Sequence, residues 1–97
     1  MLILVTYDVN TETKEGRKRL HDVAKKCVAH GQRLQNSVFE CNLDVAQFRK
    51  FEAEITKIID VETDSLRFYN LGNNYDNRLT YIGIKPCIPV DKGVLIV

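Results

Sequence analysis

Asp8 is the residue whose type and position could do chemistry. It follows the apolar run Leu2-Ile3-Leu4-Val5 closely, and polar residues begin at Asn10. A carboxylate at the mouth of a central strand can hold a metal ion or accept a proton. The alternative is an Asp that ends the strand and caps the next turn, and spacing alone favours that role. Asp8 is therefore the candidate catalytic residue and metal ligand, with both interpretations open.

Basic residues are concentrated in one segment. Between Lys14 and Arg33 lie seven basic residues against two acids, a local balance of +5, and the rest of the chain carries −4. Such segregation is expected where one face meets a polyanion, although a solvated helix face gives the same pattern. Guanidinium groups grip phosphate oxygens in a planar fork, so arginines lead the candidates. The candidate nucleic-acid contacts are Arg17, Arg19, Arg33, Lys14, Lys18 and Ser37.

Two aromatic residues are expected to support this site. Tyr7 points to the opposite strand face from Asp8 and is expected to be half-buried with its hydroxyl satisfied, and Phe39 is expected in the core. Ser37 lies beside a predicted bend, where it either donates to a phosphate or closes the turn. Both histidines are expected at the surface, because nothing orients either ring as a general base.

The pattern of apolar residues predicts the elements that position these side chains. Residues 2–9 form a strand that is apolar on both faces, and residues 32–43 form a kinked arm or two short strands. Residues 64–71 form a last strand, which a Gly-Asn-Asn turn ends. Two amphipathic helices lie between the strands. Their predicted buried stripes are Leu20, Val23, Ala24, Cys27 and Val28, and Phe48, Phe51, Ile55, Ile58 and Ile59.

Two local signals mark the helix boundaries. Gly31 is expected to cap the end of the first helix, and Asp44 with Gln47 forms an acidic capping box at the start of the second. The order strand, helix, one or two strands, helix, strand predicts an α+β sandwich of ferredoxin-like type. Both helices then cover one face of an antiparallel sheet.

The other sheet face requires a second cover, since the first strand is apolar on both faces. We therefore expect a homodimer in which the sheets of two copies face each other. The predicted division is a ferredoxin-like domain at 1–80 and a C-terminal segment at 81–97. That segment holds the apolar stretches Ile82-Gly83-Ile84 and Val94-Leu95-Ile96-Val97, separated by Pro86 and Pro89. We expect it to pair with a sheet edge, its own or the partner's.

Composition limits the classes of protein. The 97 residues, 44% hydrophobic and 28% charged, fit one domain. The apolar runs are far shorter than the roughly 20 residues that cross a bilayer. The three cysteines are widely spaced and lack a C-x-x-C pair, so neither a disulfide framework nor a zinc site is indicated. We expect a cytoplasmic protein with no membrane partner.

Four motifs in order resemble the CRISPR-associated endonuclease two family, the small spacer-acquisition partner of the CRISPR integrase. They are Val5-Thr6-Tyr7-Asp8-Val9; Arg17-Lys18-Arg19-Leu20; the stretch from Gly31 to Glu40; and Ser65-Leu66-Arg67-Phe68-Tyr69-Asn70-Leu71-Gly72. The ending Leu71-Gly72-Asn73-Asn74-Tyr75 resembles the subtype I-C branch. Members of that branch have been regarded as double-stranded DNA nucleases.

The resemblance implies a ferredoxin-like homodimer in which Asp8 from each copy meets across the two-fold axis with Mg²⁺ between them. Two carboxylates within about 5 Å repel by roughly 3 kcal/mol at an effective dielectric of 20, so they share a proton or bind a cation. The expected function is Mg²⁺-dependent hydrolysis of phosphodiester bonds during spacer acquisition, with double-stranded DNA favoured and RNA as the alternative substrate. A non-catalytic dimeric adaptor that binds DNA and bridges integrase subunits is the alternative function.

Overall fold

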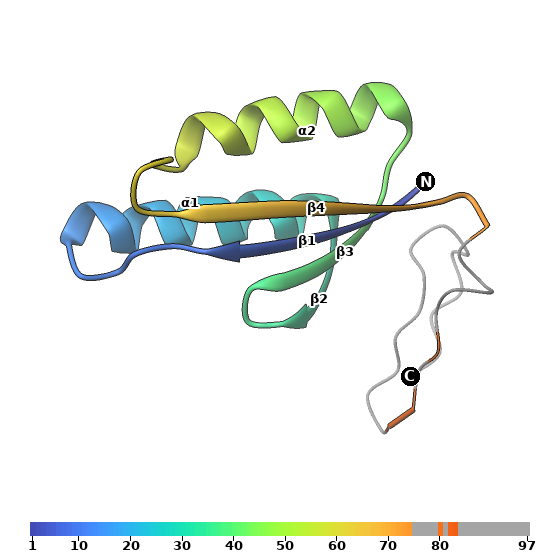
Figure 1. Cartoon of the computed structure of the whole chain (residues 1–97), viewed down its shortest axis with the longest axis horizontal. Coiled ribbons are helices and arrows are strands. Elements are labelled where there is room, and N and C mark those ends of the chain that lie inside the picture. Colours follow the sequence, from blue (N-terminus) through green and yellow to red (C-terminus); the bar gives the residue numbers. More distant parts are fainter. Residues whose placement is uncertain (75–79, 81, 84–97) are drawn as a thin grey trace.

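The computed structural model describes residues 1–74, 80, 82 and 83. Two helices cover one face of a four-stranded antiparallel sheet, as the sequence predicts (Figure 1). The sheet order is β2-β3-β1-β4, which places the N-terminal strand in the interior of the sheet. The elements are β1 (Leu2–Asp8), α1 (Lys14–His30), β2 (Gly31–Gln35), β3 (Val38–Asn42), α2 (Val45–Ile58) and β4 (Ser65–Gly72).

Strand register determines which side chains face the helices. Val5 of β1 lies opposite Phe39 of β3 and Phe68 of β4, and all three belong to or pack against the core cluster. Because side chains alternate along a strand, Asp8 lies on the face away from the helices. Its partner in β4 is Ser65.

The core lies between the sheet and the two helices. Helix α1 buries Val23 and Cys27, and α2 buries Phe51 and Ile55, all from the predicted stripes. The prediction for Val28 is wrong, because its side chain is 58% exposed. The apolar stripe of α1 is therefore narrower than the sequence pattern indicates.

The start of α2 and the end of α1 lie where the sequence predicts them. The side chain of Asp44 accepts a hydrogen bond from the backbone N–H of Gln47 at 2.7 Å, and the Gln47 side chain accepts one from the Asp44 N–H at 2.9 Å, which confirms the capping box. Helix α1 ends before Gly31, also as predicted. The backbone of Gly31 is extended, with φ −163°, so a left-handed conformation is not why glycine fits. A Cβ there would overlap the carbonyl oxygen of Glu40, so β2 approaches β3 too closely for a side chain.

The face away from the helices carries apolar side chains, as the dimer prediction requires. Leu4 is half-buried there, and Tyr69, its partner in β4, is 44% exposed. The homodimer and the division after residue 80 stay predictions. Apart from Ile82 and Gly83, the predicted pairing segment 81–97, with Val94-Leu95-Ile96-Val97, Pro86 and Pro89, lies outside the described residues. Among the helices of the described part, none is long and apolar enough to cross a membrane.

Candidate nuclease site

Asp8 is an exposed carboxylate at the last residue of β1. The strand's two neighbours both contribute to its surroundings. Ser65 lies opposite it in β4, and on the other side the backbone N–H of Tyr7 donates to the carbonyl of Ser37 at 3.2 Å. This contact places the turn between β2 and β3 beside the end of β1.

A pocket of about 430 Å³ lies at this end of β1. Four of its lining residues were predicted as site residues from two separate segments of the sequence: Tyr7, Asp8, Arg33 and Ser37. Val9, Leu20, Ala24 and Asn36 complete the lining. Arg33 and Ser37 offer a guanidinium and a hydroxyl that can bind phosphate oxygens, and Asp8, at the strand end that borders the pocket, supplies a carboxylate that can hold a cation. The Asp8 side chain itself lies on the sheet face away from the helices.

Tyr7 and Phe39 support the pocket from the core side. The Tyr7 hydroxyl donates to the carbonyl oxygen of Asn36 at 3.3 Å, as a buried tyrosine should. Burial of Tyr7 raises its pKa, the nearby Cys27 adds to this, and Arg33 opposes both. Phe39 is fully buried and stacks on Tyr7 with ring centroids 6.2 Å apart. Tyr7 therefore stays protonated at neutral pH, and Phe39 has no titratable group.

Arg33 is held over an aromatic ring. Its guanidinium carbon lies 5.0 Å from the centroid of the Phe39 ring, which is the geometry of a cation–π contact. The side chain is nevertheless exposed, so its edge is open to an anion in the pocket.

The other basic candidates lie on α1 and do not line the pocket. Arg17 is exposed, and its guanidinium donates to the carbonyl of Thr11 at 3.2 Å. Lys14 is exposed at the start of the helix, and Lys18 pairs with Asp22 at 2.8 Å while its side chain stays 76% exposed. These three side chains form an exposed basic surface beyond the β1 end, which we name the α1 basic surface (Lys14, Arg17 and Lys18).

Arg19 has a different environment from its neighbours. Its Nε donates to a carboxylate oxygen of Asp64 at 2.9 Å, and only 20% of its side chain is exposed. Asp64, whose side chain is fully buried, was not among the site residues predicted from the sequence. Its only local signal was its position as the first residue of the predicted strand 64–71, because its partner in α1 is 45 residues away.

One described chain does not provide a closed metal site. Among residues 1–74, 80, 82 and 83, no group of three or more His, Cys, Asp or Glu side chains could hold a metal ion. The single exposed carboxylate of Asp8 still fits Mg²⁺, which binds through one or two carboxylates and fills its other positions with waters and phosphate oxygens. A site with three such protein ligands would therefore need residues beyond the described part of the chain or from a second copy.

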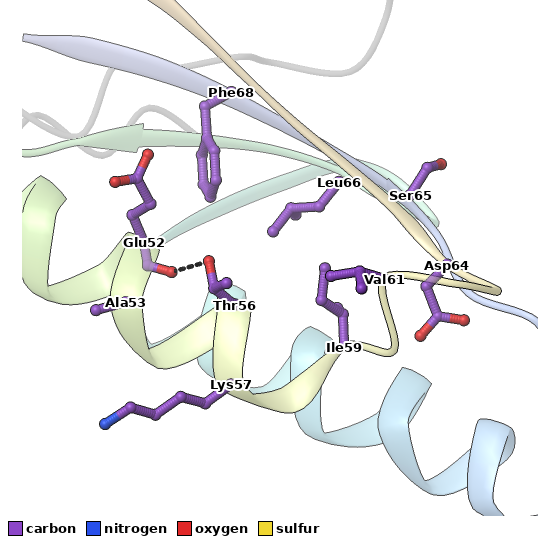
Figure 2. A pocket seen from close by; sticks show the side chains of 10 residues that line it. All are labelled: Glu52, Ala53, Thr56, Lys57, Ile59, Val61, Asp64, Ser65, Leu66 and Phe68. Atoms are coloured by element: carbon purple, nitrogen blue, oxygen red, sulfur yellow. Dashed lines mark hydrogen bonds between the residues drawn. The ribbon is translucent and has the colours of Figure 1, made fainter.

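A second cavity, of about 690 Å³, follows the edge strand β4 and α2 (Figure 2). Apolar side chains of Ile59, Val61, Leu66 and Phe68 line it, and the Thr56 hydroxyl donates to the Glu52 carbonyl at its rim at 2.6 Å. None of the predicted site residues lies here. The groove borders the strand edge to which a further strand could pair.

Comparison with known proteins identifies the family. The family model described as CRISPR associated protein Cas2 matches residues 1–79. The chain belongs to the Cas2 family. This confirms the resemblance, whereas the subtype I-C branch stays a prediction.

Two Cas2 relatives match over nearly the whole chain. One, from Halalkalibacterium halodurans, is named CRISPR-associated endonuclease Cas2 and is 53% identical over 98% of this chain and 99% of its own. Another, from Chlorobaculum tepidum, is named CRISPR-associated endoribonuclease Cas2 and is 54% identical over 88% of each chain. The crystal structure of Streptococcus pyogenes Cas2 at pH 6.5 superimposes with a TM-score of 0.73 and 58% identity, covering 86% of this chain and 100% of that one.

Proposed function

We propose that this chain is a Mg²⁺-dependent endonuclease that hydrolyses phosphodiester bonds in nucleic acid. The observation that carries the proposal is the pocket that joins Asp8 with Arg33 and Ser37. The names of the two relatives, endonuclease and endoribonuclease, support the same class of reaction. Double-stranded DNA is the favoured substrate, and RNA is the alternative.

The residues in and around the pocket have different roles in the proposed reaction. Arg33 and Ser37 bind the oxygens of the scissile phosphate, and the α1 basic surface binds the flanking backbone, where contacts are independent of sequence. Asp8 is the residue that would hold a metal ion. Bound Mg²⁺ would polarise the phosphodiester and lower the pKa of a water molecule. Tyr7 and Phe39 fix the wall from which Arg33 reaches the phosphate.

The proposed active form is a homodimer. The sheet face that carries Asp8 also carries Leu4 and Tyr69, which would pack against a second copy. Two copies with their sheets facing each other bring two carboxylates together, and these supply the ligands that one chain lacks. The biological role that we propose is spacer acquisition together with the CRISPR integrase, in the cytoplasm.

A non-catalytic adaptor is the second candidate function. It is supported by the small number of acids in the pocket, one carboxylate per chain, and by the α1 basic surface, which could hold DNA without cutting it. In this role the dimer bridges integrase subunits, and Asp8 only ends a strand.

The test is cleavage by the Asp8→Asn variant, which removes one negative charge and keeps the shape. With Mg²⁺ present, cleavage of duplex DNA and of RNA should fall at least a hundredfold, while sedimentation still reports a dimer. Glu12→Gln is the matched control, because Glu12 is another exposed acid in the following loop. Unchanged cleavage by Asp8→Asn would favour the adaptor.

A further inference from the structure

The carboxylate of Asp64 joins its own loop, residues 60–64, to the Asn10 loop and to the first half of α1, both of which are more than 40 residues away in sequence. It accepts hydrogen bonds from the backbone N–H of Asn10 at 3.0 Å and of Asp60 at 2.9 Å, from the Thr63 hydroxyl at 3.1 Å, and from Arg19 Nε at 2.9 Å. A second nitrogen of Arg19 lies 3.4 Å from it. Its side chain is fully buried, so these protein groups take the place of water.

The hydrogen bonds of Asp64 hold the backbone close to Asp8 in two places. Asn10 is two residues after Asp8, in the loop that leads to α1. Asp64 itself precedes Ser65, the residue opposite Asp8 in β4. One carboxylate therefore fixes both the loop that follows Asp8 and the start of the strand that pairs with it.

Arg19 takes part in these hydrogen bonds. Its Nε and one terminal nitrogen are directed at Asp64, and that terminal nitrogen also lies 3.4 Å from the Thr63 hydroxyl. Arg17, two residues earlier, keeps an exposed guanidinium with one contact to the carbonyl of Thr11. The two arginines look equivalent in the sequence, yet only Arg17 presents its charge to solvent.

We propose that Asp64 and Arg19 form a positioning ion pair, which orients Asp8 through the Asn10 loop, and that Arg19 does not contact phosphate. The inference rests on the proposed role of Asp8 as the metal-binding residue. Neither member of the pair touches substrate. Both act by reducing the freedom of the backbone on either side of Asp8, since small displacements of a reacting group cost up to about a hundredfold in rate.

The charge state of the pair agrees with this role. Burial acts to raise the pKa of Asp64, but the hydrogen bonds from Arg19, Asp60, Asn10 and Thr63 outweigh it and hold that pKa well below its usual range. The pair is therefore fully ionised wherever a Mg²⁺-dependent nuclease would work.

The experiment compares five variants on full-length protein: Arg19→Gln, Arg19→Lys, Asp64→Asn, Arg17→Gln and Asp8→Asn. We expect Arg19→Gln and Asp64→Asn to lower kcat about tenfold to a hundredfold with KM and DNA affinity within about twofold of the parent. Arg17→Gln should instead weaken DNA binding and reduce the dependence of log K on log salt by about one. Arg19→Lys, which restores the charge but not the fork, should recover part of the lost kcat.

Amide hydrogen exchange gives a readout that is independent of cleavage. The Asn10 N–H should exchange at least tenfold faster in Arg19→Gln and Asp64→Asn, and more slowly than this in Arg17→Gln, because the Arg17 guanidinium contacts the loop only at the carbonyl of Thr11. Should Asp64→Asn fail to fold, Arg19→Gln carries the same comparison, because Arg19 is partly exposed. A loss of DNA affinity in Arg19→Gln equal to that in Arg17→Gln would overturn the inference.

Failure of the proposed function is distinguishable from failure of this inference. If the parent cleaves no better than Asp8→Asn, the nuclease proposal is wrong. The positioning pair is then judged by DNA affinity and by Mg²⁺ titration of the Asp8 carboxyl, followed by NMR. Parental affinity with a Mg²⁺ response weakened in Arg19→Gln supports the pair, and a Mg²⁺ response that is absent or unchanged contradicts it.

Discussion

The substitution Gly16→Ala tests how closely the loop after Asp8 packs against α1. In an isolated helix, Ala at this position would be favoured over Gly by about 1 kcal/mol. In the folded protein a Cβ on Gly16 would overlap the carbonyl oxygen of Asn10 and lie 3.0 Å from its carbonyl carbon. The obstacle is backbone, which cannot turn away as the tip of a flexible side chain can.

The gain in helix propensity and the overlap with Asn10 change the free energy of unfolding in opposite directions, so their sizes decide the outcome. Relieving the overlap moves Asn10 and weakens its 3.0 Å hydrogen bond to Asp64. Overpacking costs about 1–3 kcal/mol and the buried hydrogen bond about 1 kcal/mol, against a gain of about 1 kcal/mol in helix propensity. We expect Gly16→Ala to lower the free energy of unfolding by about 2 kcal/mol, and Tm by roughly 10 °C for a domain of this size.

Urea unfolding followed by circular dichroism, at one fixed protein concentration, measures the change. The control is a synthetic peptide of residues 13–30, in which the same substitution should increase helicity because Asn10 is absent. Opposite signs in protein and peptide isolate the contact with the loop. A protein stabilised by about 1 kcal/mol would refute the packing of Asn10 on Gly16.

Two further predictions concern titratable groups. Asp64 has a folded pKa well below the unfolded value of about 3.9, so its contribution to stability is complete above that pH and is lost as pH falls toward the folded pKa. The gap in urea midpoint between the parent and Asp64→Asn should accordingly be larger at pH 7 than at pH 3, and a constant gap would contradict the assignment. Burial raises the pKa of Cys27 to about 12 and of Cys41 to about 11, so in a Cys87→Ser background iodoacetamide at pH 7.5 should modify both thiols only at the rate of unfolding. Rapid modification of the folded protein would show that the thiols are accessible.

The fold was predictable because its signals are local. The spacing of Phe51 and Ile55 within one helix, and the Asp44 side chain three residues before the N–H that it accepts, depend on residues within about two turns of each other. The apolar strand that ends at Asp8 carries the same kind of information. Such patterns survive in a single sequence. They located β1, both helices and β4, and they left open whether residues 32–43 form one kinked arm or the two strands β2 and β3.

The parts that could not be predicted depend on contacts between distant segments. Arg17 and Arg19 belong to one basic segment, and what separates them is Asp64, 45 residues from Arg19. In the sequence Gly31 resembles an ordinary helix cap, whereas in the structure glycine is required because β3 lies too close to its Cα for a side chain. For Arg19 and Gly31 the deciding neighbour comes from another element. Val28 fits the apolar period of α1, yet its side chain is exposed.

The interior position of β1 has a consequence for how the protein is made. A ribosome releases the N-terminal strand first, but one of its two neighbours is β4, in which Ser65 pairs with Asp8 and Gly72 with Leu2. These pairings close very long loops of chain, which is slow and comes late in folding. Until Asp64 and Ser65 have left the ribosome, Asp8 has no strand on one side and the Asn10 loop has no carboxylate to hold it. Because of this order of synthesis, the Asp8 carboxylate does not reach its final position until most of the chain has been translated.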